Sequence, residues 1–209
     1  MKKIGQGYFY DVYDLGNGRV LKKSRSFLDI AKSTKAESWK ARIDAWMKAR
    51  RFIKECVKTT EEMKEKISGL PQDLIGNPTF VTSVDYEQDK VLLLMDYFES
   101  HSLEENKRIV DSYIELVKTL LKYGVHDYVY KFKNSYGVNQ NGEVVFVDFN
   151  EVTFSKEKVL ELVAEKRWQT EAQYRKFPEG DLKDYLGMRF SEALTPSVIN
   201  SLWRLNMKD

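Results

Sequence analysis

Two glycines and a lysine near the start of the chain have the types and spacing of a phosphate-binding turn. Gly5 and Gly7 belong to the run Gly-Gln-Gly-Tyr-Phe-Tyr-Asp-Val-Tyr, and Lys22 follows ten residues after its valine, Val12. Glycine lets the backbone approach a ligand closely, so that N–H groups can donate hydrogen bonds to phosphate oxygens. Strand alternation places Lys22 on the same face as Val20, where its ammonium group would neutralise phosphate charge.

Phe9 and Val12 complete this motif, because the aromatic ring at the tip of the turn and the valine after it would cover a bound nucleotide. A strand rather than a helix follows the glycines, which distinguishes the turn from the glycine loop of dinucleotide-binding folds. The plainer alternative is an ordinary glycine turn between two strands, with Lys22 at the surface. We expect Lys23 to point the other way, into solvent.

Further polar side chains lie at the ends of apolar segments. The run Leu-Leu-Leu-Met95-Asp96-Tyr97-Phe98 predicts a buried strand that enters a polar junction. Asp148 follows the apolar run Val-Val-Phe-Val. A carboxylate at the end of a strand is well positioned to bind Mg²⁺ that is also bound to phosphates, because a hard cation prefers oxygen ligands. A helix cap or a turn is the alternative role for Asp148.

Three predicted β-hairpins position these residues. The first pairs residues 9–14 with 19–23 around Asn17-Gly18, the second pairs 79–87 with 90–98 around Gln88-Asp89, and the third covers 136–148 around Asn141-Gly142. Turn residues between runs of strand-forming residues are typical of hairpins. The unbroken apolar run in the second hairpin predicts a strand that is buried on both faces.

Helices are predicted between the hairpins and at the end of the chain. Apolar residues at three- and four-residue steps predict helices over about residues 33–57, 60–67 and 102–123, and a mostly helical segment after residue 148. Thr59 or Thr60 is expected to open the second of these helices. Strands and helices in this order predict an α+β protein with a sheet in its N-terminal part and helices in its C-terminal part.

In their order along the chain, these motifs resemble those of the protein-kinase-like fold over about residues 1–155. The family has a glycine-rich loop, a strand lysine, a helix glutamate, a hinge, a His-x-Asp loop with a later Asn, and then Asp-Phe-Gly. The matching residues are Gly5, Gly7, Phe9 and Val12 for the loop, Lys22 for the lysine, Met95, Asp96, Tyr97 and Phe98 for the gatekeeper and adenine-binding hinge, and Asp148-Phe149-Asn150 for Asp-Phe-Gly.

The resemblance implies a two-lobed fold: an N-terminal nucleotide-binding lobe over residues 1–98 with a small sheet and a helix, and a reduced, mostly helical C-terminal lobe over 99–209. It implies ATP and Mg²⁺ as cofactors, with Asn134 and Asp148 as metal ligands. The partner of Lys22 is left open between Glu37 and Glu55, and Glu37 is preferred by its distance along the sequence from Lys22.

The sequence departs from the family pattern in the catalytic loop. The family has Asp two residues after His and Asn five residues after that Asp, whereas Asp127 directly follows His126 and Asn134 comes seven residues after Asp127. A longer loop would make Asp127 the catalytic base. A loop of ordinary length would put Val129 at the base position, and the protein would then bind nucleotide without transferring phosphate. The third glycine of the loop is also replaced, by Tyr10.

The expected activity is therefore ATP- and Mg²⁺-dependent transfer of a phosphoryl group to a hydroxyl of an unidentified acceptor. The alternatives are a pseudokinase-type regulatory or partner-binding module, and an α+β binding protein without a nucleotide site. Only 61 residues follow Asp148, and Ala-Pro-Glu is absent from them. The chain therefore resembles a minimal bacterial or phage-type kinase, comparable to small-molecule, lipopolysaccharide-core or atypical kinases, without a eukaryotic-type peptide lobe.

The composition of the chain limits which other partners and sites are expected. The chain has 209 residues, 34 Lys+Arg against 32 Asp+Glu, a net charge of +2 and one cysteine. This balance does not favour nucleic-acid or membrane binding, and one cysteine excludes a multi-cysteine metal site. The longest clean apolar run is too short to span a bilayer, so we expect a cytoplasmic protein. The four tryptophans are expected to pack in the core or between lobes, and the basic run over residues 48–58 is expected to be a solvated helix face.

Overall fold

The strands and helices of the computed structural model belong to two units, which are described one at a time. The structure describes residues 1–33, 38–128, 130–175, 177–178 and 180–203. The first unit contains Met1–Ser68 and Asn77–Lys90, and the second contains Gly69–Gly76 and the chain from Val91 onward. The chain thus enters the second unit at Gly69, leaves it at Asn77 and returns to it at Val91. Strands and helices occur together, which confirms the α+β class.

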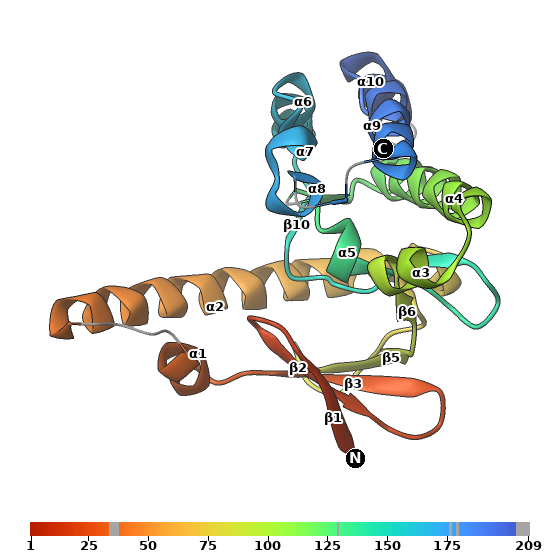
Figure 1. Cartoon of the computed structure of the whole chain (residues 1–209). Helices are drawn as coiled ribbons and strands as arrows, with labels where there is room; N and C mark the ends of the chain where they lie inside the picture. The colour runs from red at the N-terminus through yellow and green to blue at the C-terminus, as the bar shows by residue number, and fades with distance from the viewer. Residues whose placement is uncertain (34–37, 129, 176, 179, 204–209) are drawn as a thin grey trace. The chain divides into compact units, whose positions relative to one another are not determined.

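The first unit is built on a five-stranded antiparallel sheet (Figure 1). Its strands are β1 (Lys2–Gln6), β2 (Tyr10–Asp14), β3 (Arg19–Ser24), β4 (Thr79–Phe80) and β5 (Tyr86–Asp89), in the spatial order β1-β2-β3-β5-β4. Gly16 and Gly18 between β2 and β3 have φ of 80° and 78°, a backbone conformation that glycine adopts without steric cost. The first predicted hairpin is therefore confirmed.

Two helices follow β3 in the first unit: α1 (Phe27–Ser33) and the 29-residue α2 (Trp39–Ile67). The hydroxyl of Ser38 accepts a hydrogen bond from the N–H of Ala41 at 3.2 Å and caps the start of α2. The prediction of separate helices over 33–57 and 60–67 is wrong, because α2 continues through Thr60. The Thr60 hydroxyl donates to the carbonyl of Cys56 at 2.8 Å instead of capping a new helix.

The second predicted hairpin is also wrong. Gln88 and Asp89 do not form a turn but lie in β5, paired with β3. Beyond them, only β6 (Leu92–Leu93) is extended, and the chain then forms α3 (Leu94–Ser100). An unbroken apolar run has no period that separates a strand from a helix, and leucine and methionine are good helix formers. The strand expected over residues 90–98 is therefore mostly helix.

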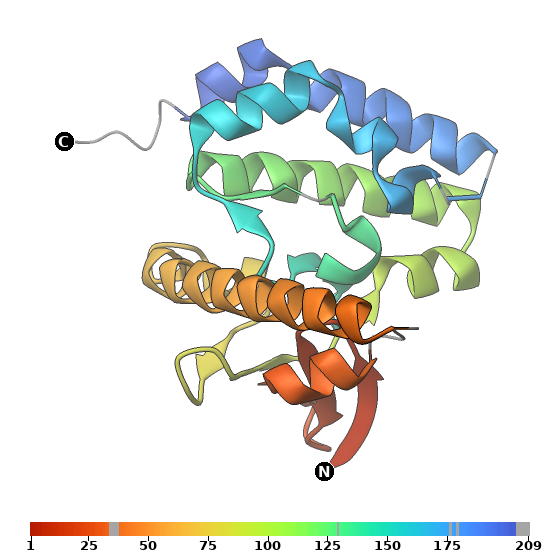
Figure 2. The ribbon, with the colours of Figure 1, turned by 90° about the vertical axis from the view of Figure 1, so that its left-hand side faces the viewer.

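The second unit is organised around α4 (Leu103–Lys122). This helix begins with a capping box, in which Ser102 accepts from the N–H of Glu105 and the Glu105 carboxylate accepts from the N–H of Ser102. The helices α9 (Asp181–Ala193) and α10 (Pro196–Trp203) pack along it, as Figure 2 shows. Its other elements are η1 (Gln72–Ile75), β7 (His126–Asp127), α5 (Phe132–Ser135), β8 (Tyr136–Val138), β9 (Val144–Phe146), β10 (Val152–Thr153), α6 (Lys156–Ala164), α7 (Arg167–Thr170) and α8 (Ala172–Arg175).

Two short ladders complete the second unit. One has the order β6-β8-β9 and the other pairs β7 with β10, all antiparallel. The β8–β9 pair confirms the third predicted hairpin, with Gly142 at φ 81° in its turn. Gly137 on β8 has no room for a side chain, since a Cβ there would lie 2.4 Å from Cγ2 of Val91. That close approach lets β6 pair with β8.

The tryptophans do not all lie in packed cores. Trp168 is 2% exposed and stacks on Phe190, with ring centroids 5.1 Å apart. Trp39 and Trp46 on α2 are exposed, so the expectation of core packing is wrong for these two. None of the helices in the described part of the chain combines the length and the apolar character needed to cross a membrane.

Candidate functional site

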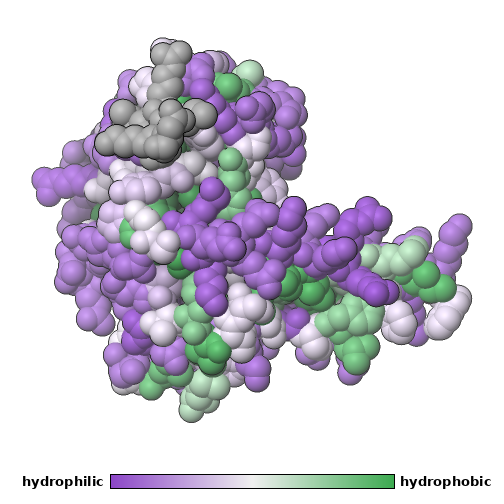
Figure 3. Space-filling view, turned by 180° about the vertical axis from the view of Figure 1, so that it is seen from behind, coloured by the Kyte–Doolittle hydropathy of each residue, from purple (hydrophilic) through white to green (hydrophobic). Residues whose placement is uncertain are grey.

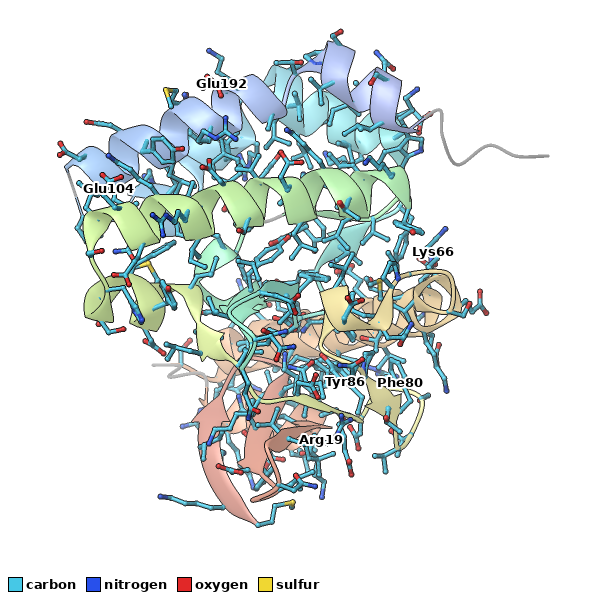
Figure 4. The ribbon with its side chains drawn as sticks, turned by 90° about the vertical axis from the view of Figure 1, so that its right-hand side faces the viewer. Arg19, Lys66, Phe80, Tyr86, Glu104 and Glu192 are labelled. Atoms are coloured by element: carbon cyan, nitrogen blue, oxygen red, sulfur yellow. The ribbon has the colours of Figure 1, made fainter. Side chains whose placement is uncertain are left out.

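The sheet of the first unit aligns three candidate nucleotide-binding residues across its strands. Gly5 on β1 pairs with Val12 on β2, Val12 pairs with Lys22 on β3, and Lys22 pairs with Tyr86 on β5. Directly opposed residues of antiparallel strands share a face of the sheet. Phe80 on β4 ends this row, and Figure 4 shows it beside Tyr86, with ring centroids 5.3 Å apart. We call Gly5, Val12, Lys22, Tyr86 and Phe80 the cross-strand row.

The side chain of Lys22 is buried beside aromatic rings and is not at the surface. Its exposed fraction is 8%, and Nζ lies 5.9 Å from the ring centroid of Tyr10 and 5.7 Å from that of Tyr86. An ammonium group within about 6 Å of an aromatic centroid is attracted to the face of the ring. Val20 is buried and Lys23 is exposed, which confirms the predicted alternation of this strand.

Helix α2 contributes a hydroxyl group beside the row. The hydroxyl oxygen of Tyr10 lies 3.4 Å from Oγ1 of Thr60 and donates to the carbonyl of Val84 at 3.0 Å. Glu55, one of the two glutamates considered as a partner for Lys22, has an exposed side chain on this helix. Glu37, the preferred one, lies outside the described residues.

The glycine turn between β1 and β2 is closed by its own backbone and by an arginine. The N–H of Gly7 donates to the carbonyl of Tyr10 at 2.7 Å. Arg25 donates from Nη1 to the carbonyls of Gly7 and Tyr8, at 3.2 and 3.3 Å. Neither Gly5 nor Gly7 has a positive φ, and a Cβ added at either would meet its nearest neighbour at an ordinary 3.6 or 3.5 Å. The fold itself therefore does not require glycine at these two positions.

The two aromatic residues of this turn differ in exposure. Phe9 is 2% exposed, and its ring lies edge-on to Tyr10 at 4.7 Å and to Phe52 of α2 at 6.4 Å. Tyr8 is 50% exposed, with its ring 4.7 Å from that of Phe52. Phe9 therefore belongs to the core of the first unit, and the exposed aromatic ring at the turn is that of Tyr8.

In the second unit, Asp127 is buried at the end of β7. Its exposed fraction is 4%, and Oδ2 accepts a hydrogen bond from the N–H of Lys131 at 2.9 Å. Lys131 forms an ion pair with Glu151, and Val152 pairs with Asp127 across the β7–β10 ladder. These contacts hold Asp127 and Lys131 against the segment that leads into β10.

Aromatic side chains surround this carboxylate. Burial, and after it the negative charge of Asp127, raises the pKa of Tyr113, Tyr130 and Tyr136. Burial also lowers the pKa of His126 to about 4, so its imidazole is neutral at neutral pH. Nε2 of His126 and the hydroxyl of Tyr130 have no hydrogen-bond partner within the described residues. A buried neutral histidine of this kind supports the loop and is not set up to carry charge.

Asn134 and Asp148 lie on segments that a backbone hydrogen bond joins. The N–H of Val147 donates to the carbonyl of Ser135 at 2.8 Å. Asn134 is exposed on α5, and Asp148 is partly buried two residues after β9. Both side chains offer oxygen atoms, the ligand type that Mg²⁺ prefers. In the part of the chain that the structure describes, no three His, Cys, Asp or Glu side chains gather as a metal site.

The candidate gatekeeper and hinge residues Met95, Asp96, Tyr97 and Phe98 lie on α3 in the second unit, and not on an extended segment. Met95 is 8% exposed, Asp96 is exposed in the first turn, and Phe98 is half-buried. The ring of Phe98 lies edge-on to Phe177 at 5.9 Å, and its carbonyl accepts from Nδ2 of Asn106 at 2.9 Å. In this structure the α3 residues Met95 and Phe98 therefore contribute to packing.

Sequence reasoning missed two basic residues that hold the candidate loops. Arg25 fixes the carbonyls of the glycine turn, and Lys131 links Asp127 to Glu151. For Lys131 a signal was available, since it stands three residues before Asn134 in a polar loop. For Arg25 none was, because its contacts with the turn come from the folded path of the chain.

Compared with known proteins, the chain matches no protein-family model and has no significant similarity to a curated protein. Its function is therefore inferred from its own residues.

Proposed function

We propose that this protein binds ATP with Mg²⁺ on a protein-kinase-like fold and transfers the γ-phosphoryl group to a hydroxyl of an acceptor. The cross-strand row is the observation that supports the proposal most. It aligns Gly5 of the glycine turn with Val12 and with Lys22 on the third strand, and the phosphate-binding lysine of kinases also lies on the third strand. In kinases a helix follows this strand, and in this protein the helices α1 and α2 follow β3.

The proposed roles follow from charge and position. Gly5 and Gly7 would let the backbone approach the phosphates, and Lys22 would neutralise their charge. Asp148 and Asn134 would bind Mg²⁺, which keeps several waters and is held by one or two protein oxygens together with phosphates. The bound metal would neutralise charge on the transferred group. Since this transition state is loose, catalysis would depend on positioning and electrostatics.

Thermal unfolding with ATP, with and without Mg²⁺, tests the nucleotide site. A ligand that binds only the folded state stabilises it by about 2.7 kcal/mol at a concentration of about 100 Kd. We expect a Mg²⁺-dependent rise in Tm for the wild type that Asp148→Ala abolishes. Asp184→Ala, which removes an exposed carboxylate on α9, should keep the full rise. The absence of any Tm shift at about millimolar ATP would contradict the proposal.

A second candidate is a pseudokinase-type module that binds nucleotide without transferring phosphate. Asp127 favours it, because this carboxylate is 4% exposed and already accepts the N–H of Lys131. A general base must come within hydrogen-bond reach of the acceptor hydroxyl. Val129, the other residue at the base position, lies outside the described residues.

Asp127→Asn separates the two candidates. An enzyme that uses Asp127 as its base would lose phosphoryl transfer to water or to added alcohols and keep the Mg²⁺–ATP shift in Tm. A pseudokinase would transfer no phosphate even as wild type. In that case the substitution would change only stability, through the hydrogen bond to Lys131.

A further inference from the structure

The N-terminal half of α2 exposes large apolar side chains. Trp39 is 72% exposed, Met47 58%, Trp46 47% and Ile43 41%. Trp39, Ile43 and Met47 follow one another at steps of four residues, and Trp46 lies three residues after Ile43, which places all four on one side of the helix. Ala49 on the same helix is fully buried instead. These four side chains therefore lie outside the core of the first unit.

The apolar surface extends from α2 onto α1. The ring of Phe27 lies edge-on to Trp46 with centroids 5.8 Å apart, and Leu28 beside it is 53% exposed. Figure 3 shows apolar residues among hydrophilic ones on these two helices. We call Leu28, Trp39, Ile43, Trp46 and Met47 the exposed apolar face.

Basic side chains accompany this face. Residues 39–54 contain six basic side chains and one acidic one, Asp44, all of them exposed; the basic ones are Lys40, Arg42, Lys48, Arg50, Arg51 and Lys54. Within the described part of the chain none of the six takes part in an ion pair. Residues 39–54 thus carry a net charge of +5, and since the whole chain carries +2, all other residues together carry −3. The near-neutral total therefore conceals a strongly basic segment in the N-terminal half of α2.

We propose that the exposed apolar face and the basic residues around it bind the surface of an anionic lipid membrane. Amphipathic helices with tryptophan and aliphatic residues on one side and lysine and arginine around them lie flat in the membrane interface. Tryptophan rings favour that depth, between headgroups and acyl chains. Arginine and lysine would meet the lipid phosphates and carboxylates. This interaction is peripheral and requires no membrane-spanning segment.

The composition of the surface favours lipid over nucleic acid. Nucleic-acid backbones are bound mainly by basic and polar side chains, which leaves Ile43, Met47 and Leu28 without a role. Burial of these three in the acyl boundary would add hydrophobic free energy to the electrostatic attraction. Both contributions therefore point to the same partner.

Co-sedimentation with vesicles tests the proposal. The full chain is mixed with phosphatidylcholine vesicles that contain or lack phosphatidylserine, and tryptophan fluorescence is read in the same samples. We expect binding to the anionic vesicles with a blue shift of the emission, and a large loss of binding when salt is raised to about 1 M, where the Debye length falls to about 3 Å.

Two variants address the two contributions. Arg50→Glu, Arg51→Glu and Lys54→Glu together should weaken vesicle binding by at least about tenfold. Trp39→Ser with Met47→Ser should weaken it while leaving Trp46 as a fluorescence reporter. The matched control reverses three exposed charges of the second unit, Arg108→Glu, Lys122→Glu and Arg175→Glu. It should bind as the wild type does.

The proposal is overturned by any of four results. The first is that the protein does not bind anionic vesicles, and the second is that it binds vesicles without phosphatidylserine equally well. The third is that the control variant loses as much vesicle binding as the Arg50, Arg51 and Lys54 variant. The fourth is that the protein binds a mixed-sequence DNA duplex and not vesicles. A dimer in solution that the Trp39→Ser and Met47→Ser variant dissociates would also overturn it, because a second copy would then cover this face.

Discussion

At the scale of single residues, Gly5 and Gly7 allow binding to be separated from folding. Neither has a left-handed backbone, and a Cβ at either finds its nearest neighbour at 3.6 or 3.5 Å. We therefore expect Gly5→Ala and Gly7→Ala to fold with a Tm near that of the wild type and to lose much of the Mg²⁺–ATP shift. Gly142→Ala, at φ 81° in the β8–β9 turn, is the reverse control: less stable, with the shift retained. Full nucleotide binding by both N-terminal variants would show that the turn does not contact phosphate.

His126 should make the protein less stable in acid. Burial lowers its pKa from 6.5 to about 4, so between these values the unfolded chain binds a proton that the folded chain does not. The stability is complete above about pH 6.5 and is lost as the pH falls toward about 4, by on the order of 3 kcal/mol. Urea unfolding at a series of pH values measures this slope.

His126→Phe removes the titrating group and should flatten the slope between these pH values. His101→Gln replaces an exposed histidine at the C-terminal end of α3. This variant should show the same dependence of stability on pH as the wild type. Equal slopes in His126→Phe and the wild type would mean that other groups cause the acid sensitivity.

The sequence predicted which face of β3 carries Lys22 but not what lies beside it. Alternation depends only on neighbours along the strand, and Val20, Lys22 and Lys23 follow it. Tyr86, which pairs with Lys22, comes from a strand that the sequence assigned to a different hairpin. The sequence predicts Phe9 at the tip of the turn, whereas its ring is buried and lies edge-on to Phe52 of α2, a contact that sequence spacing does not show.

At the scale of elements, α2 offers a direct test of helix continuity. Glu61 is exposed in the interior of this helix, six residues before its end at Ile67, whereas it would be the first residue of a helix that began after Thr60. Proline is tolerated at a first helical position but costs about 3 kcal/mol in a helix interior. We therefore expect Glu61→Pro to lower the free energy of unfolding by about that amount.

Trp39→Pro, at the true first position of α2, is the control and should be nearly neutral. A small effect of Glu61→Pro, similar to that of Trp39→Pro, would restore the two-helix interpretation. Circular dichroism would also report the loss of helix in the Glu61→Pro variant.

A helix or strand was predicted correctly where its hydrophobic period and its turn or capping residues were both present in the local sequence. The hairpins with Asn-Gly turns and the amphipathic α4 were predicted because their periods and end signals agree. The run from Val91 to Phe98 has no such period, and tertiary contacts decided its structure: Leu92 and Leu93 pair with β8, and the next residues form α3. The loop around Asp127 had neither period nor end signal.

At the scale of the whole molecule, the two units interleave in the sequence. Gly69–Gly76 belongs to the second unit, although residues before and after it belong to the first. The sequence could suggest two parts from the order of strands and helices, but it could not assign this segment. Its assignment depends on the contact of η1 with β9, which joins residues about seventy positions apart in the chain.

This interleaving predicts that one substitution in η1 will destabilise residues far away along the chain and spare its sequence neighbours. Ile75 is fully buried in the second unit and Met63 of α2 is fully buried in the first. A large-to-alanine change in a core costs about 2–5 kcal/mol. In hydrogen exchange, we expect Ile75→Ala to accelerate β8 and β9 and to leave β1–β3 protected, whereas Met63→Ala should do the opposite. Uniform acceleration of both units by either variant would contradict two separate cores, since it would mean that they unfold together.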